Sequence, residues 1–103
     1  DNAKFHAFVK ACREMGITVP IIPGLKPVTS KKQMNMLPKT FYIDLPAELS
    51  SEILKCKTDE EVEKVGERWL LEQSRELKKS GVPVLHHYTL GKPHVVANVV
   101  REL

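Results

Sequence analysis

The chain has 103 residues, of which 42% are hydrophobic and 28% charged, and this balance excludes an intrinsically disordered protein. The formal net charge is +3, with both signs spread along the chain, so no basic surface indicates nucleic-acid binding. The apolar runs are far shorter than the ~18 residues of a membrane span, and the first residues resemble an amphipathic helix instead of a signal peptide, so we expect a cytoplasmic protein without membrane partners.

The N-terminal quarter is predicted to form a helix followed by a strand. From Asn2 to Met15 the apolar residues recur at helical spacing, and Gly16 stands where a residue after a helix C-terminus is often glycine. The β-branched run Ile17–Ile22 is followed by Pro23 and Gly24, which indicates a buried strand of about four to six residues.

A short helix and an extended connection are predicted next. Thr29 or Ser30 can cap a helix that runs to about Leu37, because Pro38 disfavours helical geometry in the residue before it. The segment 40–45 alternates like a strand but precedes another proline, and we interpret it as an extended connection.

Two further helices are predicted over the middle of the chain. Pro46 suits the first turn of a helix that runs to about Lys55. Thr58 and Glu61 have the spacing of a capping box, which begins a long helix that Gly81 ends. The residues expected on its buried side are Val62, Val65, Trp69, Leu70 and Leu77.

The C-terminal part is predicted to add a second strand, Val82–Leu90, and a last helix, Pro93–Leu103. The last helix should bury Val95, Val96, Val99, Val100 and Leu103. The order of elements is typical of parallel α/β units with crossover helices, so the predicted fold class is α/β with two parallel strands surrounded by helices. Two such strands need neighbours on both edges, which indicates a piece of a larger sheet.

Cysteine and histidine residues give no sign of a metal site. Cys12 and Cys56 lie far apart in helical contexts, and we expect buried, reduced thiols. His86 and His87 are neighbours in a strand and point to opposite faces, so no metal is predicted.

Four segments in a fixed order carry a resemblance to a known family. The first combines Phe8–Cys12 with Met15–Ile17, and the other three are Ile21–Val28, Gly81–Pro83 and Leu85–Leu90. Together they resemble methylenetetrahydrofolate reductases over nearly the whole chain. The resemblance implies an oxidoreductase of one-carbon metabolism and methionine biosynthesis. Its FAD takes hydride from NADH or NADPH and passes it to 5,10-methylenetetrahydrofolate, giving 5-methyltetrahydrofolate.

The resemblance also implies a (β/α)8 TIM barrel, of which 103 residues are about two-fifths. Residues 1–103 would form a single partial domain, the C-terminal fragment from the sixth helix through the eighth βα unit. The family's acidic catalytic residue and most FAD contacts would lie upstream, so we assign no catalytic or cofactor-binding residue and expect the fragment alone to be inactive.

Four substrate-binding residues are implied by the resemblance. Gln33 matches a glutamine that contacts the folate or nicotinamide ligand, and Leu37 stands where one bacterial type has a phenylalanine packed on the ligand. Tyr88 and Leu90 match positions beside the folate at the mouth of the barrel. Without the resemblance, a solvated helix position is the favoured interpretation of Gln33, and Leu37 and Tyr88 can equally be core residues.

Other functions remain open at this point. One is a non-catalytic interaction module built from a barrel piece. Another is an unrelated barrel enzyme that binds phosphate in the loop Thr29–Lys32, although capping and solvated lysines explain that loop as well. Exposed strand edges and apolar helix faces further predict self-association of the fragment, and we expect a homo-oligomer at full length.

Overall fold

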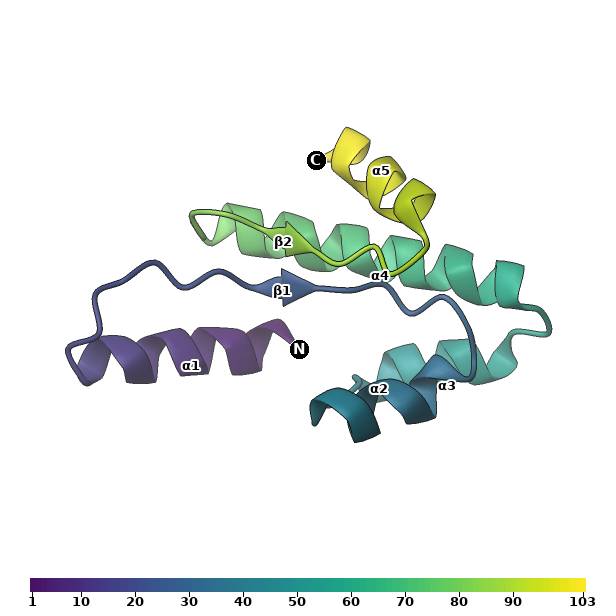
Figure 1. The fold of residues 1–103 in the computed structure, drawn as a ribbon, viewed down its shortest axis with the longest axis horizontal. Coiled ribbons are helices and arrows are strands. Elements are labelled where there is room, and N and C mark those ends of the chain that lie inside the picture. The colour runs from purple at the N-terminus through teal and green to yellow at the C-terminus, as the bar shows by residue number, and fades with distance from the viewer.

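The computed structural model describes residues 1–103, and it contains five helices and two short strands. In chain order the elements are α1 (Asn2–Glu14), β1 (Gly24–Leu25), α2 (Gln33–Phe41), α3 (Ala47–Lys55), α4 (Asp59–Lys79), β2 (His86–His87) and α5 (Pro93–Glu102) (Figure 1). The predicted order of helices and strands is therefore confirmed. No helix is both long and apolar enough to cross a membrane.

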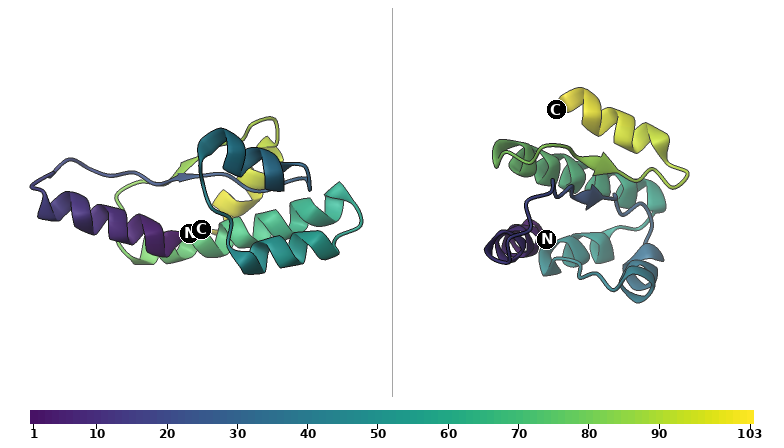
Figure 2. Two further views of the ribbon diagram at one scale, coloured as in Figure 1. Left: turned by 90° about the horizontal axis from the view of Figure 1, so that it is seen from below. Right: turned by 60° about the vertical axis from the view of Figure 1, so that its left-hand side comes forward.

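The two strands are parallel, as predicted. Gly24 is in register with His86, and Leu25 with His87. The long helix α4 runs alongside the strand pair, and α5 packs on α4. Figure 2 shows α5 on one side of the strands and α1 and α2 on the other. This arrangement is compatible with a piece of a βα barrel.

Two groups of buried side chains form the core. The first lies under the loop after β1, between α2, α3 and the start of α4, and consists of Val28, Leu37, Leu49, Ile53, Cys56 and Val62. The second joins β1 to the later part of α4 and to α5, and consists of Leu25, Leu70, Leu77, Val96 and Val99. Cys12 and Cys56 are free and buried, which confirms the prediction for the thiols.

Local sequence signals set the C-terminal end of α1. Gly16 has a φ of 82°, a conformation that favours glycine. Its N–H donates to the carbonyl of Arg13 at 3.0 Å, and the N–H of Ile17 donates to the carbonyl of Cys12 at 3.0 Å. This pair of bonds is a Schellman motif, so the predicted helix end is confirmed.

The long helix α4 begins at its predicted cap. The N–H of Glu61 donates to Oγ1 of Thr58 at 3.3 Å, while the Glu61 carboxylate accepts from the N–H of Lys57 at 2.6 Å. The carboxylate thus serves the amide one residue earlier than a capping box predicts. Of the predicted buried side, Val65 and Trp69 are only half-buried.

The first strand lies later in the chain than predicted. Ile17–Ile22 forms no strand, and its side chains at Ile17, Val19 and Ile22 are exposed. The strand forms instead at Gly24–Leu25, because only there does β2 supply a partner. A proline within the run and another directly after it also lack the N–H groups that a sheet needs.

The second strand is shorter than predicted. Of Val82–Leu90 only His86 and His87 are in β2, although the N–H of Tyr88 still donates to the carbonyl of Leu25 at 2.8 Å. Leu90 has a φ of 41° and lies in a turn, so the alternation of side chains does not extend to it. A strand continues only as far as its partner, and β1 has two residues.

The second helix differs from its prediction at both ends. It begins at Gln33, after a turn, and continues through Pro38 to Phe41. Pro38 removes one N–H from the helix but does not end it. Tyr42, with a φ of 54°, ends the helix, and the extended connection begins there.

The helices α3 and α5 fit their predictions more closely. Pro46 is the N-cap of α3, which ends at Lys55 as expected. In α5 the residues Val95, Val96 and Val99 are buried as expected, but Val100 is 53% exposed and Leu103 is only half-buried.

Candidate functional site

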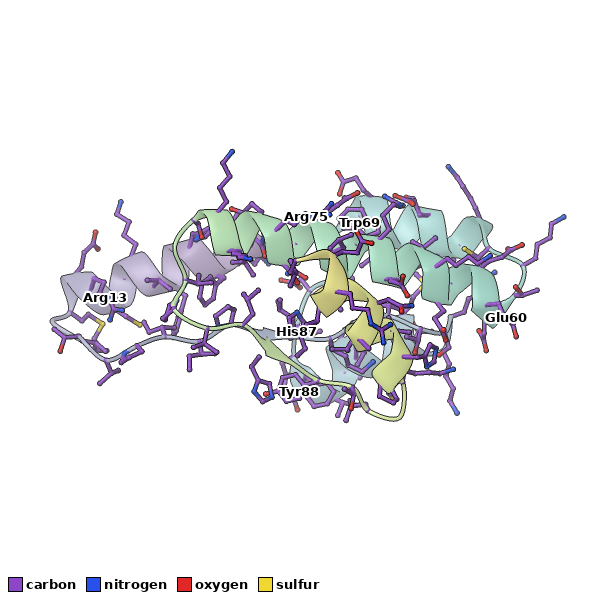
Figure 3. The ribbon with its side chains drawn as sticks, turned by 90° about the horizontal axis from the view of Figure 1, so that it is seen from above. Arg13, Glu60, Trp69, Arg75, His87 and Tyr88 are labelled. Atoms are coloured by element: carbon purple, nitrogen blue, oxygen red, sulfur yellow. The ribbon has the colours of Figure 1, made fainter.

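The strand pair has one covered face and one open face. Leu25 and His87 face α4, where Leu25 packs with Leu70, and Nε2 of His87 lies 3.0 Å from the hydroxyl of Ser74. Tyr88 projects to the opposite side of the strand from His87 (Figure 3). Because parallel α/β sheets bind ligands at the carboxyl ends of their strands, the residues following β1 and β2 are the candidates.

A cleft of about 1020 Å³ follows the unpaired edge of β1. Its walls come from the stretch Gly24–Val28, the start of α1, the middle of α4 and the connection from α2 to α3. Three of the four residues implied by the resemblance line it, namely Leu37, Tyr88 and Leu90, but Gln33 does not. The cleft is mostly apolar and large enough for an aromatic ligand.

Tyr88 is held by two neighbours at the open face. Its ring centroid lies 4.5 Å from that of His86. A Cβ atom added at Gly24 would lie 2.8 Å from the Tyr88 ring, so a larger residue there would displace the ring from this position. About half of Tyr88 stays exposed, and its ring is therefore accessible to a ligand.

Leu37 and Leu90 reach the cleft in different ways. Leu37 is 2% exposed and belongs to the core beneath the loop after β1. It contributes an apolar floor, with most of its surface committed to packing. Leu90 is 61% exposed and reaches the cleft from the turn after β2.

Gln33 sits at the start of α2 in a network of hydrogen bonds. Its carbonyl Oε1 accepts from the Thr29 N–H at 2.8 Å and from Nζ of Lys26 at 3.2 Å. Its amide Nε2 donates to Oγ1 of Thr29 at 3.1 Å. Nζ of Lys26 also donates to the carbonyl of Pro27 at 2.9 Å. Gln33 is thus bonded within the protein, beside a lysine that lines the cleft.

Beside the start of α1, the cleft is lined by the carboxylate of Glu76, which is already paired. The Glu76 carboxylate lies 2.9 Å from Nε2 of His6, and Asn2 also donates to it. The hydrogen bond from His6 is the main reason that the pKa of Glu76 is lowered from its usual value. This part of the cleft therefore carries a carboxylate that stays ionised.

Two features of the cleft had no signal in the sequence. Lys26 follows the first strand in a loop, where a lysine is ordinarily solvated. Gly66 lies in the middle of α4, where a Cβ atom would come within 1.9 Å of the carbonyl oxygen of Val28. Its glycine lets the loop after β1 rest against α4, and this contact shapes the wall of the cleft.

Comparison with known proteins decides the family. The family model described as methylenetetrahydrofolate reductase matches residues 1–103. The chain belongs to the methylenetetrahydrofolate reductase family. The resemblance in the segments around the two strands is thereby confirmed.

Relatives in the methylenetetrahydrofolate reductase family come from animals, plants and bacteria. The chain is 31% identical to a probable methylenetetrahydrofolate reductase (NADPH) of Caenorhabditis elegans, over 96% of this chain and 15% of that protein. It is 30% identical to a probable methylenetetrahydrofolate reductase (NADH) of Oryza sativa, over 100% of this chain and 18% of that protein. It is also 30% identical to the 5,10-methylenetetrahydrofolate reductase of Escherichia coli, over 89% of this chain and 31% of that protein. The chain therefore spans less than a third of the length of these reductases.

Proposed function

We propose that the chain is part of a flavin-dependent methylenetetrahydrofolate reductase that uses NADH or NADPH to reduce 5,10-methylenetetrahydrofolate. The observation that carries the proposal is the family match over all 103 residues. The relatives' names include both NADPH and NADH, and they give no reason to prefer one for this chain.

The cleft along β1 supports a role on the substrate side. Tyr88 offers an accessible ring and Leu90 an exposed apolar side chain on one wall, and Leu37 offers an apolar floor. We assign these residues to contact with the flat rings of the folate, because stacking and apolar contact suit them. Gln33 belongs to the same site through its bond to Lys26.

The residues of this chain do not by themselves make a site for FAD. A flavin dinucleotide needs groups for its pyrophosphate, and the lysine and histidine side chains that line the cleft are Lys26 and His6, of which His6 is bonded to Glu76. When bound, the flavin would supply hydride transfer. We propose that other parts of the enzyme hold it and that residues 1–103 alone are inactive.

Two measurements test this function. The full-length protein should purify with a flavin spectrum and should oxidise NADH or NADPH in a manner that depends on methylenetetrahydrofolate. Residues 1–103 alone should show neither property. A full-length protein with bound flavin but no turnover of methylenetetrahydrofolate would contradict the proposed substrate, and a stoichiometric FAD complex of residues 1–103 would contradict the assignment of the flavin to other parts.

A further inference from the structure

Lys26 has an unusual position for a lysine. It follows β1 at the carboxyl end of the strand pair and lines the cleft together with Tyr88 and Leu90. Its side chain is partly buried, and this burial lowers the pKa of the ammonium from its ordinary value. A buried ammonium is unfavourable unless hydrogen bonds or an opposite charge compensate for the lost water.

The hydrogen-bond partners of the Lys26 ammonium in this structure are uncharged. The ion pairs of the chain do not include Lys26. Its ammonium donates to the carbonyls of Pro27 and Gln33. An ammonium carries three N–H donors, so one donor and the full positive charge remain for another group.

The network behind Lys26 holds it in place. Both the Thr29 N–H and the Lys26 ammonium can only donate, so the atom of Gln33 between them must be the carbonyl oxygen. Thr29 is 3% exposed and fixes Gln33 through its N–H and its hydroxyl. Gln33 therefore fixes the position of the Lys26 ammonium group through this hydrogen bond, while Lys26 itself lines the cleft.

We propose that Lys26 is a binding residue of the cleft that takes an anionic oxygen of the ligand, a carboxylate or a phosphate, and that Gln33 is a positioning residue acting through it. The inference rests on the proposed function, which makes the cleft a substrate side. The glutamate portion of a folate carries carboxylates, and a nicotinamide dinucleotide carries a pyrophosphate. Both therefore have the required chemistry.

The test uses calorimetric titration of the full-length protein, which needs no turnover. Three ligands distinguish the sources: a folate, the same folate without its glutamate portion, and NADH. Lys26→Met should raise the Kd of either the folate or NADH about ten- to a hundredfold, and Lys26→Arg should keep most of the affinity. If the folate supplies the anion, the analogue without glutamate should bind equally well to both proteins.

Two readouts separate direct binding from a general structural effect. Salt should weaken the affected ligand for the wild type more steeply than for Lys26→Met, because the variant lacks the charge. Gln33→Ala should add little to Lys26→Met, since both remove the same contact. The unfolding temperature of Lys26→Met provides a check that the variant is folded.

Unchanged Kd values of the folate and NADH in Lys26→Met would overturn the inference, as would an equal salt dependence in both proteins. Additive effects of Gln33→Ala and Lys26→Met would overturn the positioning role. If the protein fails to reduce methylenetetrahydrofolate but Lys26→Met still weakens an anionic ligand, the proposed function fails and the Lys26 site stands.

Discussion

The hydroxyl of Ser74 in α4 lies 3.0 Å from Nε2 of His87 in β2. Ser74 is completely buried, so this bond joins the strand to the helix that covers it. Burial is the main cause that lowers the pKa of His87, and the neighbouring His86 contributes to the same effect. The folded chain therefore holds a proton on His87 less tightly than the unfolded chain does.

The first prediction follows from this pKa. As the pH falls below about 6.5, the unfolded chain takes up the proton first, so the free energy of unfolding should decrease until the folded form is protonated as well. His87→Gln keeps a side chain that can bond Ser74 but does not titrate. Urea unfolding at pH 7.5 and 5.5 should show a smaller pH effect in this variant. An equal pH effect in both proteins would assign the acid sensitivity to other groups.

The second prediction concerns the contact between α4 and the loop after β1. Alanine is normally favoured over glycine inside a helix by about 1 kcal/mol. At Gly66 the added methyl group would clash with the Val28 carbonyl, so Gly66→Ala should lower the free energy of unfolding by about 1–3 kcal/mol.

A matched control lies two residues earlier in the same helix. Lys64 is exposed and forms no ion pair, so Lys64→Ala should change stability by less than about 0.5 kcal/mol. Denaturant unfolding of both variants measures the difference. A stabilising effect of Gly66→Ala would show that the loop does not rest against α4.

The third prediction concerns Tyr88 in the full-length protein. Tyr88→Ala removes a ring that is accessible at the open face, so it should slow the half-reaction with folate by about tenfold. The flavin content should stay unchanged, because we place the flavin contacts elsewhere. Stopped-flow kinetics and the flavin absorbance measure the two properties. Loss of flavin with normal folate kinetics would reverse the assignment of Tyr88.

The fourth prediction concerns residues 1–103 studied alone. The chain leaves apolar side chains exposed, among them Phe8, Met15, Val19, Ile22 and Tyr42, and each strand has one unpaired edge. Such a surface favours association between copies. Because α5 is anchored by buried valines, we expect pairing at the strand edges instead of exchange of α5.

Light scattering over a dilution series tests this prediction. The average mass should rise with concentration, and Ile22→Lys, an exposed position two residues before β1, should reduce the rise. A monomer of constant mass over the whole series would show that the chain covers its own edges.

The sequence by itself determined the features that depend on local chemistry. The cap at Thr58, the glycine after α1 and the apolar periodicity of α4 each act within a few residues, and the structure contains all three. The family could also be predicted from the sequence, because short segments around the two strands carry the resemblance to it. The roles implied for Gln33, Leu37, Tyr88 and Leu90 stay predictions.

Only the tertiary structure decided the features that depend on distant partners. A strand exists where another strand pairs with it, so β1 lies at Gly24–Leu25 and the more β-prone run before it is exposed. Gly66 matters because a loop 38 positions earlier in the chain touches it at Val28. Lys26 faces the cleft because α2 brings Gln33 back against it. None of these contacts can be predicted from a local sequence pattern, since each joins segments that meet only when the chain has folded.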